Sequence, residues 1–135
     1  MEALETASLS FVYLGIDVAS KMVESAKKAY PERNFETLAM EHIDMISDTF
    51  DRIVFLASFH HLETEAARTE VLIKARQRLR RGGKIWMTNW NLRSETNMKK
   101  YLPTHPDGVD YSIKFGQAKR FYHAFQLDEL TRLCF

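Results

Sequence analysis

Side chains that can bind ligands follow two short apolar segments of the chain. Asp17 ends the segment FVYLGID, and Ser58, His60 and His61 come directly after the segment IVFLA. In open α/β sheets the ligand crevice lies outside the carboxyl ends of the strands. A carboxylate at such an end, close to a glycine such as Gly15 that lets a ligand approach, can accept hydrogen bonds from both hydroxyls of a ribose. Asp17 is therefore a candidate ribose ligand, and the alternative is that it caps the following helix.

The histidines offer several kinds of chemistry. Adjacent residues of an extended chain point to opposite sides, so we expect only one of His60 and His61 to face the crevice. Two histidines without further ligands make a poor metal site, and we predict no metal. His123 lies between Tyr122 and Ala124. For this residue, substrate contact and a hydrogen-bonded structural role both stay open.

The elements that would position these side chains alternate between strand and helix. Residues 53–57 form an unbroken apolar run, which suits a central parallel strand covered on both faces. Ser20 and Thr64 can cap helices, the first of which would stop at Pro31. The sequence predicts further strands at residues 11–17, 34–38 and 84–90, a loop over 39–48, and a second helix that ends near residues 80–83.

This alternation predicts an α/β fold with a Rossmann-like, mostly parallel sheet and flanking helices. We expect a single domain over residues 1–135. Within it, residues 92–125 contain Pro103 and Pro106 and have the character of a long insertion on the substrate side. Residues 128–133 are expected to begin another helix.

The composition argues against several classes of protein. The chain has 19 basic and 18 acidic residues, so its net charge does not favour nucleic acid or membrane. Cys134 is the only cysteine, which excludes an internal disulfide. The amino terminus lacks the basic and apolar regions of an export signal, and no apolar run approaches membrane-spanning length. We therefore expect a cytoplasmic protein with no membrane partner.

Four motifs together resemble those of class I S-adenosylmethionine-dependent methyltransferases. They are Gly15-Ile16-Asp17 with Ser20-Lys21-Met22, Phe50-Asp51-Arg52-Ile53-Val54, His60-His61-Leu62, and Leu79-Arg80-Arg81-Gly82-Gly83-Lys84-Ile85. Each motif is common alone, but the four follow the order and spacing of the family over residues 11–90. The resemblance implies S-adenosylmethionine as the cofactor, with Asp17 as its ribose ligand. The cofactor-binding residues that it implies are Gly15, Asp17, Ala39, Met40 and Ser58.

The later part of the chain resembles a narrower branch, the tRNA wobble-uridine methyltransferases. Asn89-Trp90-Asn91 and the segment KRFYHAF over residues 119–125 carry this likeness. It implies tRNA as a partner and a carboxylate as the methyl acceptor, which is ionised at neutral pH and needs no general base. We therefore predict no catalytic residue. The substrate-binding residues that the resemblance implies are His60, His61, Asn89, Trp90, Asn91, Arg120, Tyr122 and His123.

The chain departs from the family in two places. It contains no GxGxG motif, whose backbone receives the methionine part of the cofactor in the family, and Ala39 stands where the family commonly has an acid for adenine. We expect an incomplete fold without the family's first and final strands, and a chain that alone binds the cofactor weakly and is inactive. Unpaired strand edges would favour a homodimer or a partner that supplies the missing strand.

Residues 92–125 carry a local positive charge, with six basic residues against three acids. Aromatic residues lie between them, which suits phosphate contact and base stacking on RNA. An amphipathic cover over the sheet is the alternative. Two other functions also stay open. One is a cofactor-free scaffold derived from the methyltransferase fold, favoured by the absent glycine loop and by Ala39, and the other is a small-molecule methyltransferase.

Overall fold

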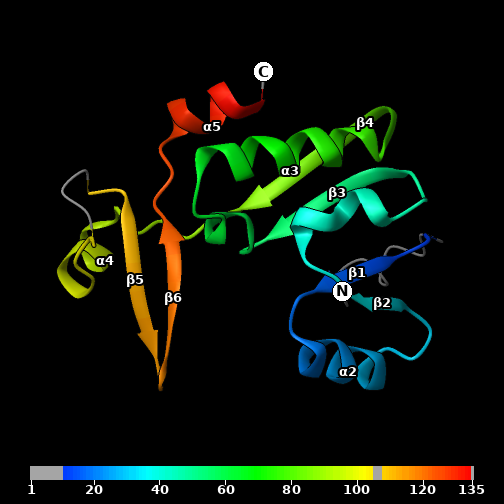
Figure 1. The fold of residues 1–135 in the computed structure, drawn as a ribbon, viewed down its shortest axis with the longest axis horizontal. Helices are drawn as coiled ribbons and strands as arrows, with labels where there is room; N and C mark the ends of the chain where they lie inside the picture. The colour runs from blue at the N-terminus through cyan, green and yellow to red at the C-terminus, as the bar shows by residue number, and fades with distance from the viewer. Residues whose placement is uncertain (1–10, 105–107, 135) are drawn as a thin grey trace. The chain divides into compact units, whose positions relative to one another are not determined.

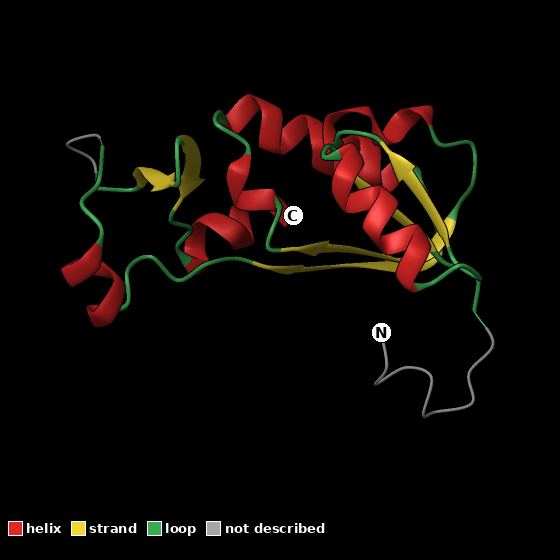
Figure 2. Ribbon diagram, turned by 90° about the horizontal axis from the view of Figure 1, so that it is seen from below, coloured by secondary structure: helices red, strands yellow, loops and turns green. Residues whose placement is uncertain are grey.

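The structure is a computed structural model that describes residues 11–104 and 108–134. The chain divides into two compact units, residues 1–42 and 43–135, which are described separately. Figure 1 and Figure 2 show helices beside short pairs of strands. Among the described residues the strands form three separate two-stranded sheets.

The first unit is built from a strand, a helix and a second strand. β1 (Leu14–Asp17) and β2 (Asn34–Thr37) run parallel, and helix α2 (Ser20–Ala29) connects them. The rings of Tyr13 and Phe35 pack edge to face with their centroids 5.5 Å apart. The parallel strand pair and the connecting helix match the predicted order of elements.

The start of α2 differs from the prediction. Ser20 is the first helical residue, and its predecessor Ala19 occupies the capping position without a side-chain hydrogen bond. Instead, Asp17 Oδ1 accepts a hydrogen bond from Ala19 N–H at 2.7 Å. Asp17 therefore fixes the turn into the helix, because its carboxylate accepts a backbone N–H that precedes the first helical turn.

Gly15 has a packing role in this unit. A Cβ atom at this position would lie 2.7 Å from Phe35 Cδ1 and 3.0 Å from Tyr13 Oη. The aromatic rings therefore require glycine here. Ligand approach at Gly15 stays a prediction.

The second unit holds a parallel strand pair, a hairpin and several helices. The chain enters it through η1 (Met40–Met45), a 3₁₀ helix within the segment expected to be a loop. β3 (Phe50–Leu56) and β4 (Leu79–Thr88) form the parallel pair. The other elements are η2 (Phe59–His61), α3 (Glu65–Gln77), α4 (Glu95–Lys100), β5 (Asp110–Phe115), β6 (Ala118–His123) and α5 (Leu127–Cys134).

Helix α3 lies along the β3–β4 pair (Figure 1). Thr64 Oγ1 caps the helix, as predicted, by accepting a backbone N–H of the first turn at 3.1 Å. Val71 and Ala75 of the helix are buried, and so are Ile53 and Phe55 of β3. The helix and one face of β3 therefore each contribute buried apolar side chains to this unit.

The other face of the pair is exposed, which corrects the prediction of a strand covered on both faces. Val54, Leu56 and Trp86 are 54%, 75% and 54% exposed. Val54 lies opposite Trp86 in the register, and the Arg52 guanidinium lies 5.4 Å from the centroid of a Trp86 ring. An unbroken apolar run predicts a strand, but it does not show whether a second layer covers that strand.

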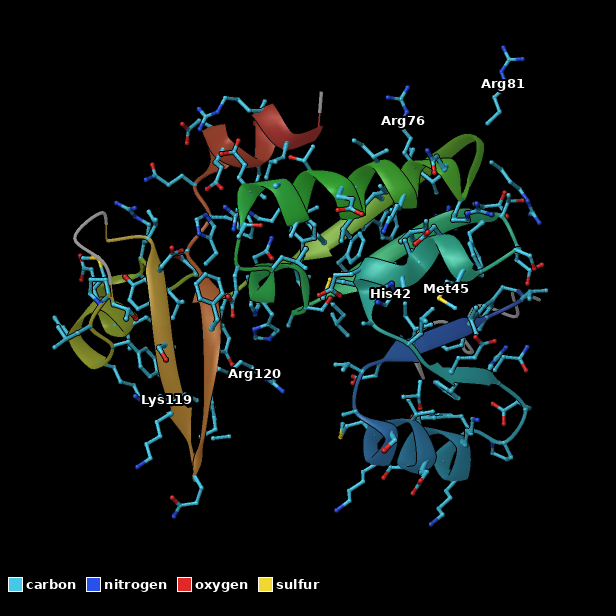
Figure 3. The ribbon with its side chains drawn as sticks, in the orientation of Figure 1. His42, Met45, Arg76, Arg81, Lys119 and Arg120 are labelled. Carbon is cyan, nitrogen blue, oxygen red and sulfur yellow. The ribbon has the colours of Figure 1, made fainter. Side chains whose placement is uncertain are left out.

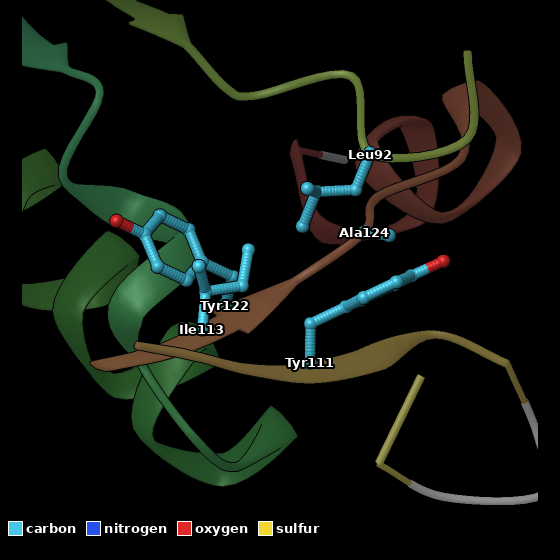
Figure 4. Close-up of a cluster of buried hydrophobic side chains, with 5 residues drawn as sticks. All are labelled: Leu92, Tyr111, Ile113, Tyr122 and Ala124. Atoms are coloured by element: carbon cyan, nitrogen blue, oxygen red, sulfur yellow. The ribbon is translucent and has the colours of Figure 1, made fainter. Parts of the chain in front are cut away.

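β5 and β6 form an antiparallel hairpin within the segment expected to be a long insertion. Gly116 and Gln117 connect the strands, with Gly116 at a φ of +58°. The hairpin contributes to a second cluster of buried side chains, which Figure 4 shows. Its members are Leu92, Tyr111, Ile113, Tyr122 and Ala124.

The architecture is the predicted class, α/β with mostly parallel strands, flanking helices and an incomplete sheet. Within the described residues, β1 and β3 each pair with one strand only. The described helices include none that is long and apolar enough to cross a membrane. The single-domain organisation stays a prediction.

Candidate functional site

The carboxyl ends of β1 and β2 meet at one edge of the first unit. Asp17 lies opposite Thr37 in the parallel register, and its carbonyl accepts a hydrogen bond from Leu38 N–H at 3.1 Å. Ala39 and Met40 follow directly. The structure therefore brings three of the predicted cofactor-binding residues, Asp17, Ala39 and Met40, to the same strand edge.

This edge fits part of S-adenosylmethionine. Asp17 is exposed, and its Oδ1 binds Ala19 N–H, whereas its Oδ2 accepts no hydrogen bond from any described residue. Oδ2 can therefore accept a ribose hydroxyl. The Ala39 side chain offers no acceptor for adenine, and its carbonyl already accepts a hydrogen bond from His42 N–H at 3.0 Å. The residues present fit the ribose but provide no side-chain contact to adenine at position 39.

In the second unit, the chain turns sharply where β3 ends. Ala57 has a φ of +48°, a left-handed conformation that residues other than glycine seldom adopt. Its N–H donates to the Thr88 carbonyl at 3.1 Å and lies 3.0 Å from Thr88 Oγ1. The carbonyl of Ser58, the fifth predicted cofactor-binding residue, then accepts a hydrogen bond from His61 N–H at 3.0 Å. Strained backbone of this kind often occurs at functional sites.

The two histidine rings lie together, which corrects the expectation that only one would face the site. Because the turn leads into η2 rather than an extended segment, the rings of His60 and His61 meet edge to face with centroids 4.5 Å apart. Tyr122 stacks on His60 at 5.1 Å and meets the edge of His61 at 4.5 Å. Trp90 lies 5.1 Å from Tyr122 and 6.5 Å from Phe115. These five residues are called the aromatic cluster.

Both imidazoles of the aromatic cluster have lowered pKa values. Burial is the main cause of the lowered pKa of His60, about 4, and the charges of His61 and Arg120 add to it. The Asn89 side chain opposes this shift. Burial also lowers the pKa of His61. Both rings are therefore mainly uncharged at neutral pH.

Hydrogen bonds assign the tautomers of the neutral rings. His60 Nδ1 accepts a hydrogen bond from Trp90 N–H at 3.2 Å, so its proton is on Nε2. His61 Nδ1 donates to the Phe121 carbonyl at 2.8 Å, so its Nε2 is the unprotonated nitrogen. These bonds attach η2 to β6 and to the segment after β4.

Asn89, Trp90 and Asn91 come after β4, although the prediction ended the strand at Trp90. Asn89 Oδ1 is buried and forms no hydrogen bond of standard geometry with the described residues. The Asn89 side chain nevertheless lies close enough to the His60 imidazole to favour its charged form, so this acceptor is directed at His60. Asn91 instead holds local backbone, since its carbonyl accepts from Asn97 Nδ2 at 2.8 Å and from Ser94 N–H at 3.3 Å.

Arg120 provides the positive charge beside the aromatic cluster. It lies two residues from Tyr122 on β6 and therefore on the same face of the strand. Its charge acts on both imidazoles, and no described carboxylate pairs with it. Figure 3 shows Arg120 and Lys119 on opposite sides of the hairpin. An exposed guanidinium beside aromatic rings suits an anionic group of a ligand.

His123 is part of a buried bridge. Its Nδ1 lies 2.6 Å from Asp110 Oδ1, and its Nε2 lies 2.9 Å from Glu129 Oε1. Glu129 Oε1 also lies 3.8 Å from Arg68 Nη2. Because His123 is only 6% exposed and both ring nitrogens are occupied, the structure supports the structural role of the two that the sequence left open.

Residues 2–87 match the model of the family described as the methyltransferase domain. The chain belongs to this methyltransferase family. A protein of Encephalitozoon cuniculi (strain GB-M1) that is named as a methyltransferase is 23% identical over 124 residues. The match covers 90% of this chain and 59% of the Encephalitozoon cuniculi protein.

Solved structures show the same fold. An S-adenosylmethionine-dependent methyltransferase from Methanosarcina mazei gives a TM-score of 0.74 at 19% identity, covering 97% of this chain and 70% of its own. An amino pentose methyltransferase from Micromonospora echinaspora, solved with S-adenosylmethionine bound, gives 0.66 at 15% identity, covering 96% and 67%. The fold is that of S-adenosylmethionine-dependent methyltransferases, and S-adenosylmethionine is the cofactor that goes with it. Since the chain spans only part of its relatives, the activity and substrate of the whole protein are proposals.

Sequence reasoning missed one contributor to the site, Thr88, which fixes the turn at Ala57. No local signal marked Thr88, since its role depends on which backbone segment lies beside it. Phe115 is one of the aromatic residues that the sequence placed between the basic residues of 92–125, and it joins the aromatic cluster.

Proposed function

We propose that this methyltransferase transfers a methyl group from S-adenosylmethionine to RNA, with a tRNA wobble uridine as the acceptor class. One observation carries the proposal. The aromatic cluster and Arg120, which pairs with no carboxylate among the described residues, gather where β3 and β4 end. Proteins recognise single-stranded RNA by stacking unpaired bases on aromatic rings and by hydrogen bonds to the base edges.

Each part of the site has a role in this proposal. Trp90, which is 38% exposed, provides a ring surface for a base, and the buried Tyr122 ring supports it at 5.1 Å. Asn89 stays a predicted contact to the base edge. Arg120 binds a phosphate, or the carboxylate of a modified uridine, through charge-assisted hydrogen bonds.

The chemistry places few demands on the side chains. When bound, S-adenosylmethionine supplies a methyl group on a positively charged sulfur. Asp17 of the first unit would hold its ribose. A carboxylate acceptor is already ionised at neutral pH, so no proton has to be removed. His60 and His61 then hold the aromatic cluster together as neutral rings, and the protein contributes mainly the alignment of the acceptor.

A cofactor-free binding protein is the second candidate. It is favoured by Asp17, whose Oδ1 already holds the start of α2, and by Ala39, which offers adenine no side-chain acceptor. A small-molecule acceptor is the third candidate, because one structural neighbour is an amino pentose methyltransferase.

Binding of a short single-stranded RNA, followed by fluorescence anisotropy, tests the RNA proposal. Arg120→Gln should weaken binding about tenfold, as expected for one charge-assisted hydrogen bond. Arg132→Gln is the matched control, because Arg132 is an exposed arginine on α5 that pairs with Asp128 at 3.0 Å. Absence of RNA binding by the unaltered chain, or equal losses in both variants, would contradict the proposal.

A further inference from the structure

We infer that the tip of the β5–β6 hairpin binds the sugar-phosphate backbone of RNA through Lys114 and Lys119. The inference rests on the proposed RNA substrate and extends it to a second contact surface. The tip consists of the turn at residues 116–117 and the two strand pairs that flank it. These pairs are Lys114 with Lys119 and Phe115 with Ala118.

The first observation is the register of the two lysines. Lys114 and Lys119 are direct cross-strand partners, so their side chains leave the same face of the hairpin. Both are exposed, and no described carboxylate pairs with either of them. Like charges directly opposite each other destabilise an antiparallel pair. Bound phosphates would reduce this repulsion, because each brings a negative charge to one of the two ammonium groups.

The second observation is that the positive charge continues onto the other face. Arg120 follows Lys119, and adjacent strand residues point to opposite faces. Figure 3 shows these two side chains on opposite sides of the hairpin. Positive charge on both faces of a narrow ribbon suits a flexible polyanion that passes around its tip, which describes a single-stranded backbone.

The third observation is the connection between the tip and the aromatic cluster. Phe115 is 50% exposed and belongs to both the tip and the cluster, with its ring 6.2 Å from that of Tyr122. The hairpin therefore joins the lysine pair to the proposed base site within one element. A strand that places one base at the cluster can place the phosphates of neighbouring nucleotides at the tip.

The test measures RNA affinity over a series of salt concentrations. Each phosphate contact on a single strand contributes about 0.7 to the slope of log affinity against log salt concentration. Lys114→Gln and Lys119→Gln should each lower the slope by about 0.7, and the double variant by about 1.4. Lys27→Gln with Lys28→Gln is the matched control, because it removes two exposed lysines from α2.

The outcomes separate the two proposals. No RNA binding by the unaltered chain would overturn the RNA substrate itself. RNA binding whose salt slope is the same in the unaltered chain and in the double variant would overturn the hairpin tip alone. The melting temperature without RNA provides the folding check. We expect the double variant to melt no lower than the unaltered chain, because the substitutions remove a repulsion, and the single variants report the slope independently.

Discussion

At the scale of residues, the two histidines of the aromatic cluster owe their neutral state to burial and to the positive charges around them. His60 is 2% exposed, and its pKa is lowered to about 4. An unfolded histidine binds a proton near pH 6.5, whereas this folded one does not until about pH 4. The unfolded state therefore binds more protons in this interval, and acid favours unfolding.

We predict that His60 makes the protein less stable as the pH falls from 6.5 to 4. The loss should reach up to about 3 kcal/mol, and the contribution should be fully present above pH 6.5. His60→Asn keeps an acceptor for Trp90 N–H but does not titrate, so its stability should change less over this interval. Denaturant unfolding at several pH values measures the effect, with His42→Asn as an exposed control. Parallel pH profiles for His60→Asn and the unaltered chain would show that the buried ring does not resist protonation.

Substitutions of Asp17 distinguish a cofactor-binding protein from a cofactor-free scaffold. Asp17→Ala should weaken S-adenosylmethionine binding about ten- to a hundredfold and cost about 1 kcal/mol of stability through the lost bond to Ala19. Asp17→Asn should cost less in both respects, because the amide oxygen can replace Oδ1. Calorimetric titration and thermal melting measure the two effects, with the exposed Asp48→Ala as control. Equal cofactor affinity in all these proteins would leave the resemblance as one of fold only.

Candidate site residues could be picked out from the sequence where they lie at the ends of predicted strands. Asp17 and the histidines stood out because polar residues directly follow apolar runs. The meeting of the His60 and His61 rings was not predictable, because it depends on the left-handed turn at Ala57. Alanine has no preference for a left-handed backbone, so the sequence gives no signal for this turn.

At the scale of elements, His123 ties the hairpin to α5 and, through Glu129, to α3. Loss of the hydrogen-bonding partner of a buried polar group typically costs about 1–3 kcal/mol. We predict a loss of about this size for His123→Ala, because the Asp110 and Glu129 carboxylates would lose the ring that both contact. Denaturant unfolding checks this, with the exposed His42→Ala as control. Unchanged stability combined with weaker RNA binding would contradict the structural role and show that His123 contacts the substrate.

The helices and strands up to the end of β4 at Thr88 were largely predictable from the sequence. Their hydrophobic patterns and the cap at Thr64 are local signals, and the structure follows them. The hairpin was missed because Pro103 and Pro106 suggested an irregular connection. The alternating residues on either side of Gly116 were the stronger signal.

At the scale of the whole molecule, one face of the β3–β4 pair carries exposed apolar side chains. Exposed apolar side chains beside a free strand edge are a recognised contact surface. We predict self-association that grows with concentration and that Val54→Lys weakens. Light scattering measures the molar mass, and Ile73→Lys on α3 is the control, because Ile73 is 53% exposed against 54% for Val54. A monomer at every concentration would contradict the prediction.

The family was predictable because its motifs are spread over most of the chain. The substrate was not, because it depends on how the aromatic cluster assembles from three distant segments. Asp17, Ala39 and Met40 belong to the first unit, and Ser58 and the aromatic cluster belong to the second. That Asp17 and Ser58 border one cofactor site therefore stays a prediction.

The central claim is that the aromatic cluster binds an RNA base, and photo-cross-linking tests it most directly. A single-stranded RNA that contains 5-bromouridine would be irradiated with the protein, and the cross-linked peptides would be identified by mass spectrometry. The account predicts cross-links at Trp90 and Phe115, which are 38% and 50% exposed, and their reduction in Arg120→Gln. Cross-links confined to residues outside the aromatic cluster and the hairpin tip would contradict it.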